Sequence, residues 1–199
     1  MPSNTVFSKL DAVNIILKCI GEDPVSSLSS GLPDAEAAEA VYDETMRDVL
    51  ESGWHCNTEK ETTLTLDSDS KIPLPDNCLK VDTSGDDADI DVTERDGFLY
   101  NLTDKTFTFD DDVVVDIVYL LEFTELPYRL AHYIAWVAGG KYQMRQIGSN
   151  VLEGWIEKEI NDSLAKLNAS EEASDDANVL RDSRSVALAA YRNNYIRGQ

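Results

Sequence analysis

The segment VVVDIVYLL, residues 113–121, decides how the chain is organised. Valine, isoleucine and tyrosine favour strands, and so short and continuous an apolar run is typical of a strand that is buried on both faces. We therefore expect residues 113–121 to form the central strand of a sheet. The sequence on either side predicts what surrounds it.

The region that contains this strand, residues 54–125, is rich in threonine, valine and aromatic residues, which proline, glycine and aspartate clusters divide into short runs. This pattern predicts several short strands. Arg95-Asp96-Gly97 is a good hairpin signal between two of them, and residues 102–105 are a weaker one. The other expected strands are 62–66, 78–83, 89–93, 97–102 and 105–109.

Two helices are expected before the β-rich region. Ser8 and Asp11 resemble a capping box in front of apolar residues at helical spacing, and Gly21 ends that segment. Residues 33–34, a proline and an aspartate, predict the start of a second helix that runs to about Ser52. Its inward stripe should be Ala38, Val41, Tyr42, Thr45 and Val49.

Two more helices are expected after it. Pro127 stands at a natural first helical position, and residues 128–146 carry apolar side chains on one side. The pair Gly139-Gly140 predicts either close helix packing or a kink. Ser149 can cap a fourth helix, the cleanest amphipathic segment, whose apolar positions are Leu152, Ile156, Ile160, Leu164 and Leu167.

The end of the chain changes character beyond Ala169, where the apolar stripe is lost and the charge turns from acidic to basic. We expect residues 179–199 to be an extended tail that is either free or docked on a partner. Its candidate partner-binding residues are Arg181, Arg184, Leu188, Tyr191, Arg192, Tyr195, Ile196 and Arg197.

Together these segments predict an α+β fold. It is an antiparallel four-helix bundle with a β-rich lobe inserted between the second and third helices, followed by an extended C-terminal tail. The predicted domains are a helical bundle of residues 1–53 and 126–178, an inserted β-rich domain of residues 54–125, and a tail of residues 179–199.

The composition limits the classes of function. Hydrophobic residues make up 42% of the 199 residues, which is typical of a folded globular protein. The net charge of −21 arises from 38 acidic and 17 basic residues, and no basic stripe is present that would displace counterions from a phosphate backbone. Such a surface suits either simple solubility or a conduit through which DNA slides. Neither a signal peptide nor a membrane-spanning run is recognisable.

No arrangement of residues predicts catalysis. His55, beside Trp54 and Cys56, is the nearest approach to a thiol and imidazole pair, but adjacent residues on an extended strand point to opposite faces. The three cysteines form no CxxC pair and are interpreted as buried free thiols. Trp136 and Trp155 are expected to be packing anchors rather than sugar-stacking platforms. We therefore expect a protein that is not an enzyme and has no cofactor.

Clustered aspartates make calcium the remaining ligand to consider. An EF-hand loop that began at Asp67 would need different residues at Lys71, Ile72 and Cys78. Solvated acidic hairpin tips are the favoured interpretation, and a divalent-ion site at a subunit contact stays open as the alternative. No metal site is predicted within the subunit.

Several stretches, taken in order, resemble the tail tubular protein A family of podoviruses. The most specific is residues 12–28, AVNIILKCIGEDPVSSL; the others are Ser52-Gly53-Trp54 with Asn57, residues 96–100 (DGFLY), and the valine strand that leads to Glu125-Leu126-Pro127. The resemblance covers about residues 10 to 170. It departs from the family in the middle of the chain, where aspartates are more numerous.

This resemblance implies a structural virion protein, a head-to-tail adaptor that joins the portal to the tail nozzle as a dodecameric ring around the DNA channel. DNA would pass without specific binding, and the protein would be located in the virion tail after assembly in the host cytoplasm, with no membrane partner. In the family, the helical part is associated with ring formation and portal contact, and the β lobe with the nozzle. A carbohydrate- or receptor-binding tail module and a small hydrolase with an unrecognised site are the alternatives.

Overall fold

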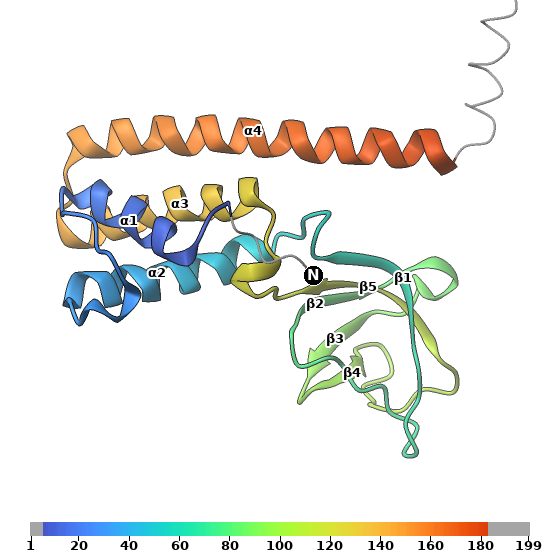
Figure 1. The fold of residues 1–199 in the computed structure, drawn as a ribbon. Helices are drawn as coiled ribbons and strands as arrows, with labels where there is room; N and C mark the ends of the chain where they lie inside the picture. The colour runs from blue at the N-terminus through green and yellow to red at the C-terminus, as the bar shows by residue number, and fades with distance from the viewer. Residues whose placement is uncertain (1–5, 183–199) are drawn as a thin grey trace, which may run out of the picture.

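The computed structural model describes residues 6–182. In chain order, this part contains α1 (Lys9–Ile20), α2 (Pro33–Leu50), β1 (Thr58–Leu64), β2 (Cys78–Thr83), β3 (Val92–Arg95), β4 (Phe98–Asn101), β5 (Val113–Tyr119), α3 (Tyr128–Gln146) and α4 (Asn150–Asp182). Three short 3-10 helices cover Leu28–Ser30, Gly85–Asp87 and Phe123–Glu125. Figure 1 shows the helices gathered on one side and the strands in a lobe at one end of α2 and α3. The prediction of a mixed α+β fold is confirmed.

Helix α1 begins and ends as the sequence predicts. The Ser8 hydroxyl accepts a hydrogen bond from the Asp11 backbone N–H at 3.1 Å, and the Asp11 carboxylate accepts one from the Ser8 backbone N–H at 2.8 Å. These two bonds form a complete capping box. Gly21 ends the helix with φ of 80°, a left-handed conformation that favours glycine.

Helices α2 and α3 supply most of the helical core. α2 ends at Leu50, two residues before the predicted position, and α3 has the predicted bounds with Pro127 as its N-cap instead of its first residue. The predicted inward stripe of α2 is buried except for Val49, which is half-buried. The core also includes the fully buried Ile16, Leu17, Leu50, Leu126, Leu130 and Ile134. Because α1, α2 and α3 all contribute to one cluster, they pack as a unit.

Close packing explains the glycine at position 139. A Cβ atom at Gly139 would lie 2.6 Å from the Cys19 sulfur, so only a residue without a side chain lets α3 approach α1 this closely. The prediction of close packing at the glycine pair is confirmed.

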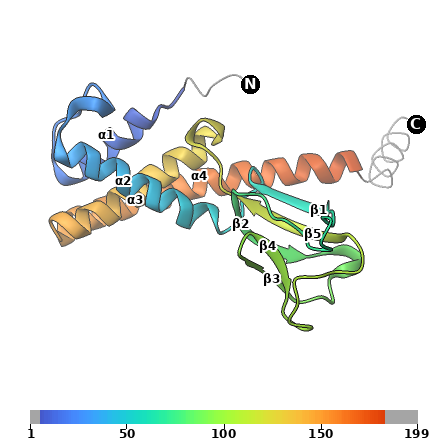
Figure 2. The same cartoon turned by 90° about the horizontal axis from the view of Figure 1, so that it is seen from below.

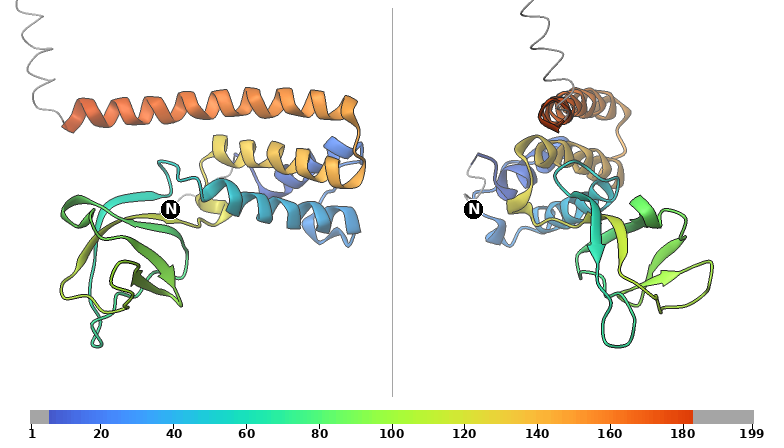
Figure 3. Two further views of the ribbon diagram at one scale, coloured as in Figure 1. Left: turned by 180° about the vertical axis from the view of Figure 1, so that it is seen from behind. Right: turned by 90° about the vertical axis from the view of Figure 1, so that its right-hand side faces the viewer.

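Helix α4 lies along α3 and is longer than the sequence predicts. It contacts α3 and α1 through a smaller cluster formed by Cys19, Trp136 and Ile156, and it reaches the main core at Leu167. The views in Figure 2 and Figure 3 show α4 continuing past α3 and alongside the β lobe. Since the main core belongs chiefly to α1, α2 and α3, a single closed four-helix bundle is not confirmed.

The predicted end of this helix is wrong, because α4 continues to Asp182 and includes residues 179–182, which we assigned to the tail. Glutamate, alanine and aspartate dominate residues 170–182. Glutamate and alanine are good helix formers even without an apolar stripe, so the helix can extend beyond the residues that pack.

Strand β5 is the centre of a three-stranded antiparallel sheet in the order β1-β5-β2, as predicted. Val113, Val115, Ile117 and Val118 are buried, whereas Val114 and Asp116 are half-buried, so burial on both faces is only partly correct. In the register, Thr62 pairs with Val115 and Val81 with Ile117.

A two-stranded hairpin, β3 and β4, completes the lobe. Asp96 and Gly97 both have positive φ values, 56° and 77°, at the predicted hairpin turn. The predicted strand at residues 105–109 is wrong. Lys105 has φ of 57°, which interrupts extended backbone, and only isolated bridges at Thr106 and Thr108 remain.

The lobe has an apolar cluster distinct from the helical core. It is formed by Ile72, Leu74, Val81, Val92, Leu99, Val113, Val115 and Ile117. Across residues 6–182, no helix is both long and apolar enough to cross a membrane.

Candidate functional site

The two parts of the molecule are joined at Asn57, which is 2% exposed. Its side-chain amide donates hydrogen bonds to the backbone carbonyls of Leu50 at 3.0 Å and Tyr119 at 2.8 Å, and its carbonyl oxygen accepts one from the Trp54 backbone N–H at 2.7 Å. The Asn57 backbone carbonyl also accepts from the Tyr119 N–H at 2.8 Å. One side chain thus ties the end of α2 to the end of the central strand.

Trp54 strengthens the same junction. Its indole N–H donates to the Val49 carbonyl at 2.8 Å, and its ring meets the Tyr133 ring edge-on with centroids 6.3 Å apart. A Cβ atom at Gly53 would lie 3.2 Å from the Thr58 hydroxyl oxygen, and Gly53 has φ of 77°. These contacts give a structural reason for the Ser52-Gly53-Trp54 and Asn57 pattern.

Asn14 fixes the loop that follows α1. Its amide donates to the Val25 carbonyl at 3.1 Å, and its carbonyl oxygen accepts from the Val25 N–H at 2.8 Å. This two-way pairing imitates a strand pair and holds the chain between α1 and α2 against α1.

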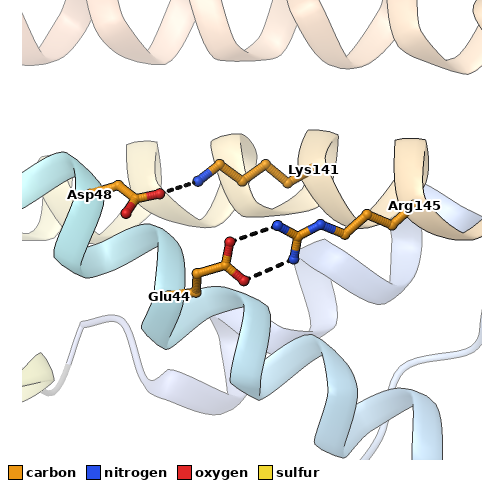
Figure 4. Close-up of polar contacts among 4 residues, drawn as sticks. All are labelled: Glu44, Asp48, Lys141 and Arg145. Carbon is orange, nitrogen blue, oxygen red and sulfur yellow. Dashed lines mark hydrogen bonds and ion pairs between the residues drawn. The ribbon is translucent and has the colours of Figure 1, made fainter.

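Ion pairs connect α2 to α3 along one face (Figure 4). The Arg145 guanidinium binds both carboxylate oxygens of Glu44, at 2.8 and 2.6 Å, and the Lys141 ammonium binds Asp48 at 2.5 Å. The hydrogen bond from Arg145 lowers the pKa of Glu44, and Glu44 raises the pKa of Arg145. Both pairs are partly exposed, so we expect them to set helix register more than stability.

Lys9 connects α1 to α2 in a similar way. Its ammonium lies 2.9 Å from both Glu39 and Asp43. Burial lowers the pKa of Lys9, but its hydrogen bonds to Glu39 and Asp43 outweigh that effect and leave the pKa raised. The lysine therefore stays charged at neutral pH.

A groove of about 520 Å³ runs between α3 and α4. Its apolar lining is Val137, Gly140, Met144, Ile156 and Ile160, and its charged rim is Lys141, Arg145, Glu153 and Glu157. Gln143 also lines it, and the Gln143 side-chain oxygen, although buried, accepts no hydrogen bond from the described residues. The groove therefore offers an apolar floor with a polar acceptor and charged edges.

Exposed apolar side chains gather at the end of the helical part where α2 begins and α3 leads into α4. Leu32 precedes α2, Met144 and Ile147 lie at the end of α3, and Val151, which is 86% exposed, lies in the first turn of α4. The Tyr142 hydroxyl lies 3.3 Å from an Asp34 carboxylate oxygen, which places the start of α2 beside the end of α3. This end faces away from the β lobe in Figure 1. Exposed apolar residues in one region are typical of an interaction surface.

An aromatic cluster lies between α1, α3 and α4. Trp136 is buried, and Trp155, 39% exposed, meets it edge-on with centroids 5.5 Å apart. The Trp136 indole N–H donates to the His132 Nε2 at 3.3 Å, so this nitrogen is unprotonated. Burial, and secondly Lys166, lower the pKa of His132. The interpretation of both tryptophans as packing residues agrees with these contacts.

The residues closest to a catalytic pair lie in a turn rather than on a strand. His55 is exposed, and its backbone N–H donates to the Glu171 carboxylate at 2.9 Å. Burial, and then Glu171, raise the pKa of the Cys56 thiol to about 11, and burial raises that of Cys19 to about 12. Both thiols are therefore protonated and weak nucleophiles at neutral pH. Only Cys19 is fully buried, so the prediction of three buried thiols is partly correct.

Several aspartates of the lobe hold its backbone in place. Asp67 accepts hydrogen bonds from the backbone N–H groups of Asp69 and Lys71, Asp112 accepts one from Leu66, and Asp87 accepts one from Val114. Among the side chains that the structure describes, no three of His, Cys, Asp or Glu are grouped so that they could hold a metal ion. These aspartates close turns and order loop segments.

Most of the predicted tail residues lie outside the part of the chain that the structure describes. Arg184, Leu188, Tyr191, Arg192, Tyr195, Ile196 and Arg197 lie outside the described residues, and Arg181 lies in the last turn of α4. The groove and the two ion pairs of Figure 4 were not among the predicted features. The ion pairs could have been predicted from their spacing, because the acidic residues on α2 and the basic residues on α3 each lie four positions apart.

Comparisons with known proteins show the family to which the chain belongs. Residues 10–177 match the family described as tail tubular protein, which covers most of the chain. The chain therefore belongs to the tail tubular protein family, and it is a structural component of a phage tail. A curated relative, tail tubular protein A of Klebsiella phage KP34, is 35% identical over 147 residues, which are 73% of this chain and 74% of the relative. The predicted resemblance is thus confirmed.

Proposed function

We propose that the protein is a head-to-tail adaptor, whose copies form a ring between the portal and the tail nozzle and enclose part of the DNA channel. The observation that carries this proposal is the division of the subunit into two apolar clusters that meet at Asn57. A subunit built this way has one body for contacts around a ring and another for contacts along its axis. Family membership supplies the setting, since the chain is a tail component.

The proposed domain limits are close to the same division, although Trp54, Leu120 and Phe123 pack against the helical core. Residues 1–53 and 126–178 would form the ring-building helical domain, with residues 54–125 inserted as the domain that meets the nozzle. Twelve copies would close the ring through one heterologous interface, because each subunit needs only two complementary surfaces for this. Assembly would take place in the host cytoplasm.

The charge of the chain supports a channel role. With 38 acidic residues against 17 basic ones, the protein repels a phosphate backbone. A channel wall that does not hold DNA lets it slide during ejection. Specific DNA binding is therefore not expected of this protein.

The test is an order-of-addition experiment with purified portal rings, the full chain and the nozzle protein of the same phage. In gradient sedimentation, the nozzle protein should travel with the portal only when the chain is present. Nozzle binding to the portal without the chain, or a chain that never sediments with portal rings, would reject the adaptor role.

A charge-reversal variant tests nozzle binding separately from portal binding. Asp110 and Asp111 are exposed in the loop before β5 and make no hydrogen bond that the structure records with another described residue. Asp110→Lys with Asp111→Lys should keep portal binding and weaken nozzle binding. The matched control, Glu36→Lys on the exposed face of α2, should leave nozzle binding unchanged.

A further inference from the structure

We infer that the groove between α3 and α4 receives the C-terminal segment, residues 183–199, of a neighbouring copy of this chain. The inference rests on the proposed ring and names the contact that links one subunit to the next. It follows from the chemistry of the groove, the composition of the segment and the length of α4.

The groove is open to an apolar ligand with basic groups. Its floor is apolar at Val137, Met144 and Ile156. On its rim, Lys141 and Arg145 are already paired with Asp48 and Glu44 of α2.

The charged groups of the rim that are not in ion pairs with described residues are acidic. Glu153 and Glu157 form no ion pair with any described residue, and both are exposed. The Gln143 side-chain oxygen in addition lacks a donor among the described residues. A ligand that carries cations and hydrogen-bond donors on an apolar body would satisfy all three groups.

The C-terminal segment has this composition. Residues 183–199 contain three arginines, Arg184, Arg192 and Arg197, and no acidic residue. All 38 acidic residues therefore belong to the rest of the chain, so the segment is positively charged in a strongly acidic protein. Leu188, Tyr191 and Tyr195 supply apolar surface, and the tyrosine hydroxyls and arginine guanidinium groups supply donors.

The length of α4 excludes docking of the whole segment within one subunit. The helix is straight in Figure 1, and from Ile160 to Asp182 it is about 33 Å long at 1.5 Å per residue. A fully extended chain from Asp182 reaches only about 20 Å by Leu188 and about 30 Å by Tyr191. Leu188 and Tyr191 therefore do not reach the groove of their own subunit, and a segment that docks there with these two anchors belongs to another copy.

The contact is heterologous, since the segment of one copy enters the groove of the next. Repeated around an axis, such a contact closes into a ring. Arginine bonds to Glu153 and Glu157 would fix its register, and the apolar anchors would exclude water from the floor of the groove.

The test is photo-crosslinking between two forms of the full chain. One form carries p-benzoylphenylalanine in place of Tyr191, and the other is labelled with ¹⁵N. After mixing and irradiation at the highest attainable concentration, mass spectrometry should find crosslinks from light to heavy chains within residues 137–160. Crosslinks confined to one chain, crosslinks to other surfaces, or no crosslink between chains would each overturn the inference.

Charge variants add a control for folding. Glu153→Lys with Glu157→Lys should lower the yield of inter-chain crosslinks about tenfold. Arg192→Glu with Arg197→Glu in the crosslinking chain should restore the yield with that variant, which a merely misfolded groove could not do. The matched control, Asp162→Lys with Glu172→Lys, changes exposed acidic residues of α4 outside the groove and should leave the yield unchanged.

Failure of the groove contact can be distinguished from failure of the adaptor role. If portal sedimentation succeeds while crosslinks map to other surfaces, the ring stands and only this contact is wrong. If the chain neither sediments with portal rings nor forms crosslinks between copies, both proposals fail.

Discussion

Replacing Asn57 with alanine should destabilise the protein by about 3 kcal/mol. The substitution removes three side-chain hydrogen bonds, which link Leu50, Trp54 and Tyr119 and whose lengths lie between 2.7 and 3.0 Å. Each is worth about 1 kcal/mol net, and the groups left behind lie in a site that is nearly closed to water. Since the free energy of unfolding of natural domains is about 5–15 kcal/mol, this loss is a large fraction of the total stability.

Urea denaturation of the full chain measures this effect. With a slope of about 2 kcal/mol per molar urea, the midpoint of Asn57→Ala should fall by about 1.5 M. Following both far-UV circular dichroism and tryptophan fluorescence tests whether the helices and the lobe still unfold together.

Asn77→Ala is the matched control, because Asn77 is exposed and donates a single bond to the Leu120 carbonyl at 3.2 Å. It should change stability by less than about 0.5 kcal/mol. Equal midpoints for Asn57→Ala and Asn77→Ala would refute the idea that Asn57 joins the helices to the lobe.

Two further substitutions test the helical part. Gly139→Ala should cost about 1–3 kcal/mol in thermal or urea unfolding, because its Cβ would lie 2.6 Å from the Cys19 sulfur, whereas Gly154→Ala, with nothing within 4 Å, should be neutral or stabilising; similar destabilisation by both would argue against close α1–α3 packing. For His132, the folded-state pKa lies below 6.5 because of burial and Lys166, so the unfolded chain takes up the proton first and stability should fall as pH drops through about 6.5. In His132→Gln, the melting temperature should depend less on pH between pH 7.5 and 5.5. An unchanged pH dependence would show that His132 does not titrate in this way.

The helices were predictable because burial and local signals agree. The capping box at Ser8, the glycine at position 21 and the stripe along α2 each reflect a local requirement of helix ends or of an apolar face. The central strand was equally clear, since residues 113–118 carry enough apolar surface to need partners on both sides.

The misplaced elements depend on interactions that are distant in sequence. β1 begins at Thr58, in a charged stretch whose sequence does not alternate apolar and polar residues. It nevertheless pairs with β5. The far half of α4 forms without an apolar stripe, because helix propensity continues where packing stops. Residues 105–109 carry strand-forming side chains, but the left-handed backbone at Lys105 prevents a strand.

The candidate site was only partly predictable for the same reason. Asn57 stood out in the sequence by its resemblance to a family pattern, but its three hydrogen bonds join residues up to 62 positions apart. The groove lies where α4 approaches Gly140 of α3, and periodicity alone does not show which helix faces come together there.

We propose that copies of this chain form a ring between the portal and the nozzle. Cryo-electron microscopy of tails assembled from the portal, the full chain and the nozzle protein tests it most directly. The account predicts a closed ring of this subunit around the channel, with the helices toward the portal and the β lobe toward the nozzle. Density for the chain only at the periphery of the tail, or portal and nozzle in direct contact without it, would contradict the account.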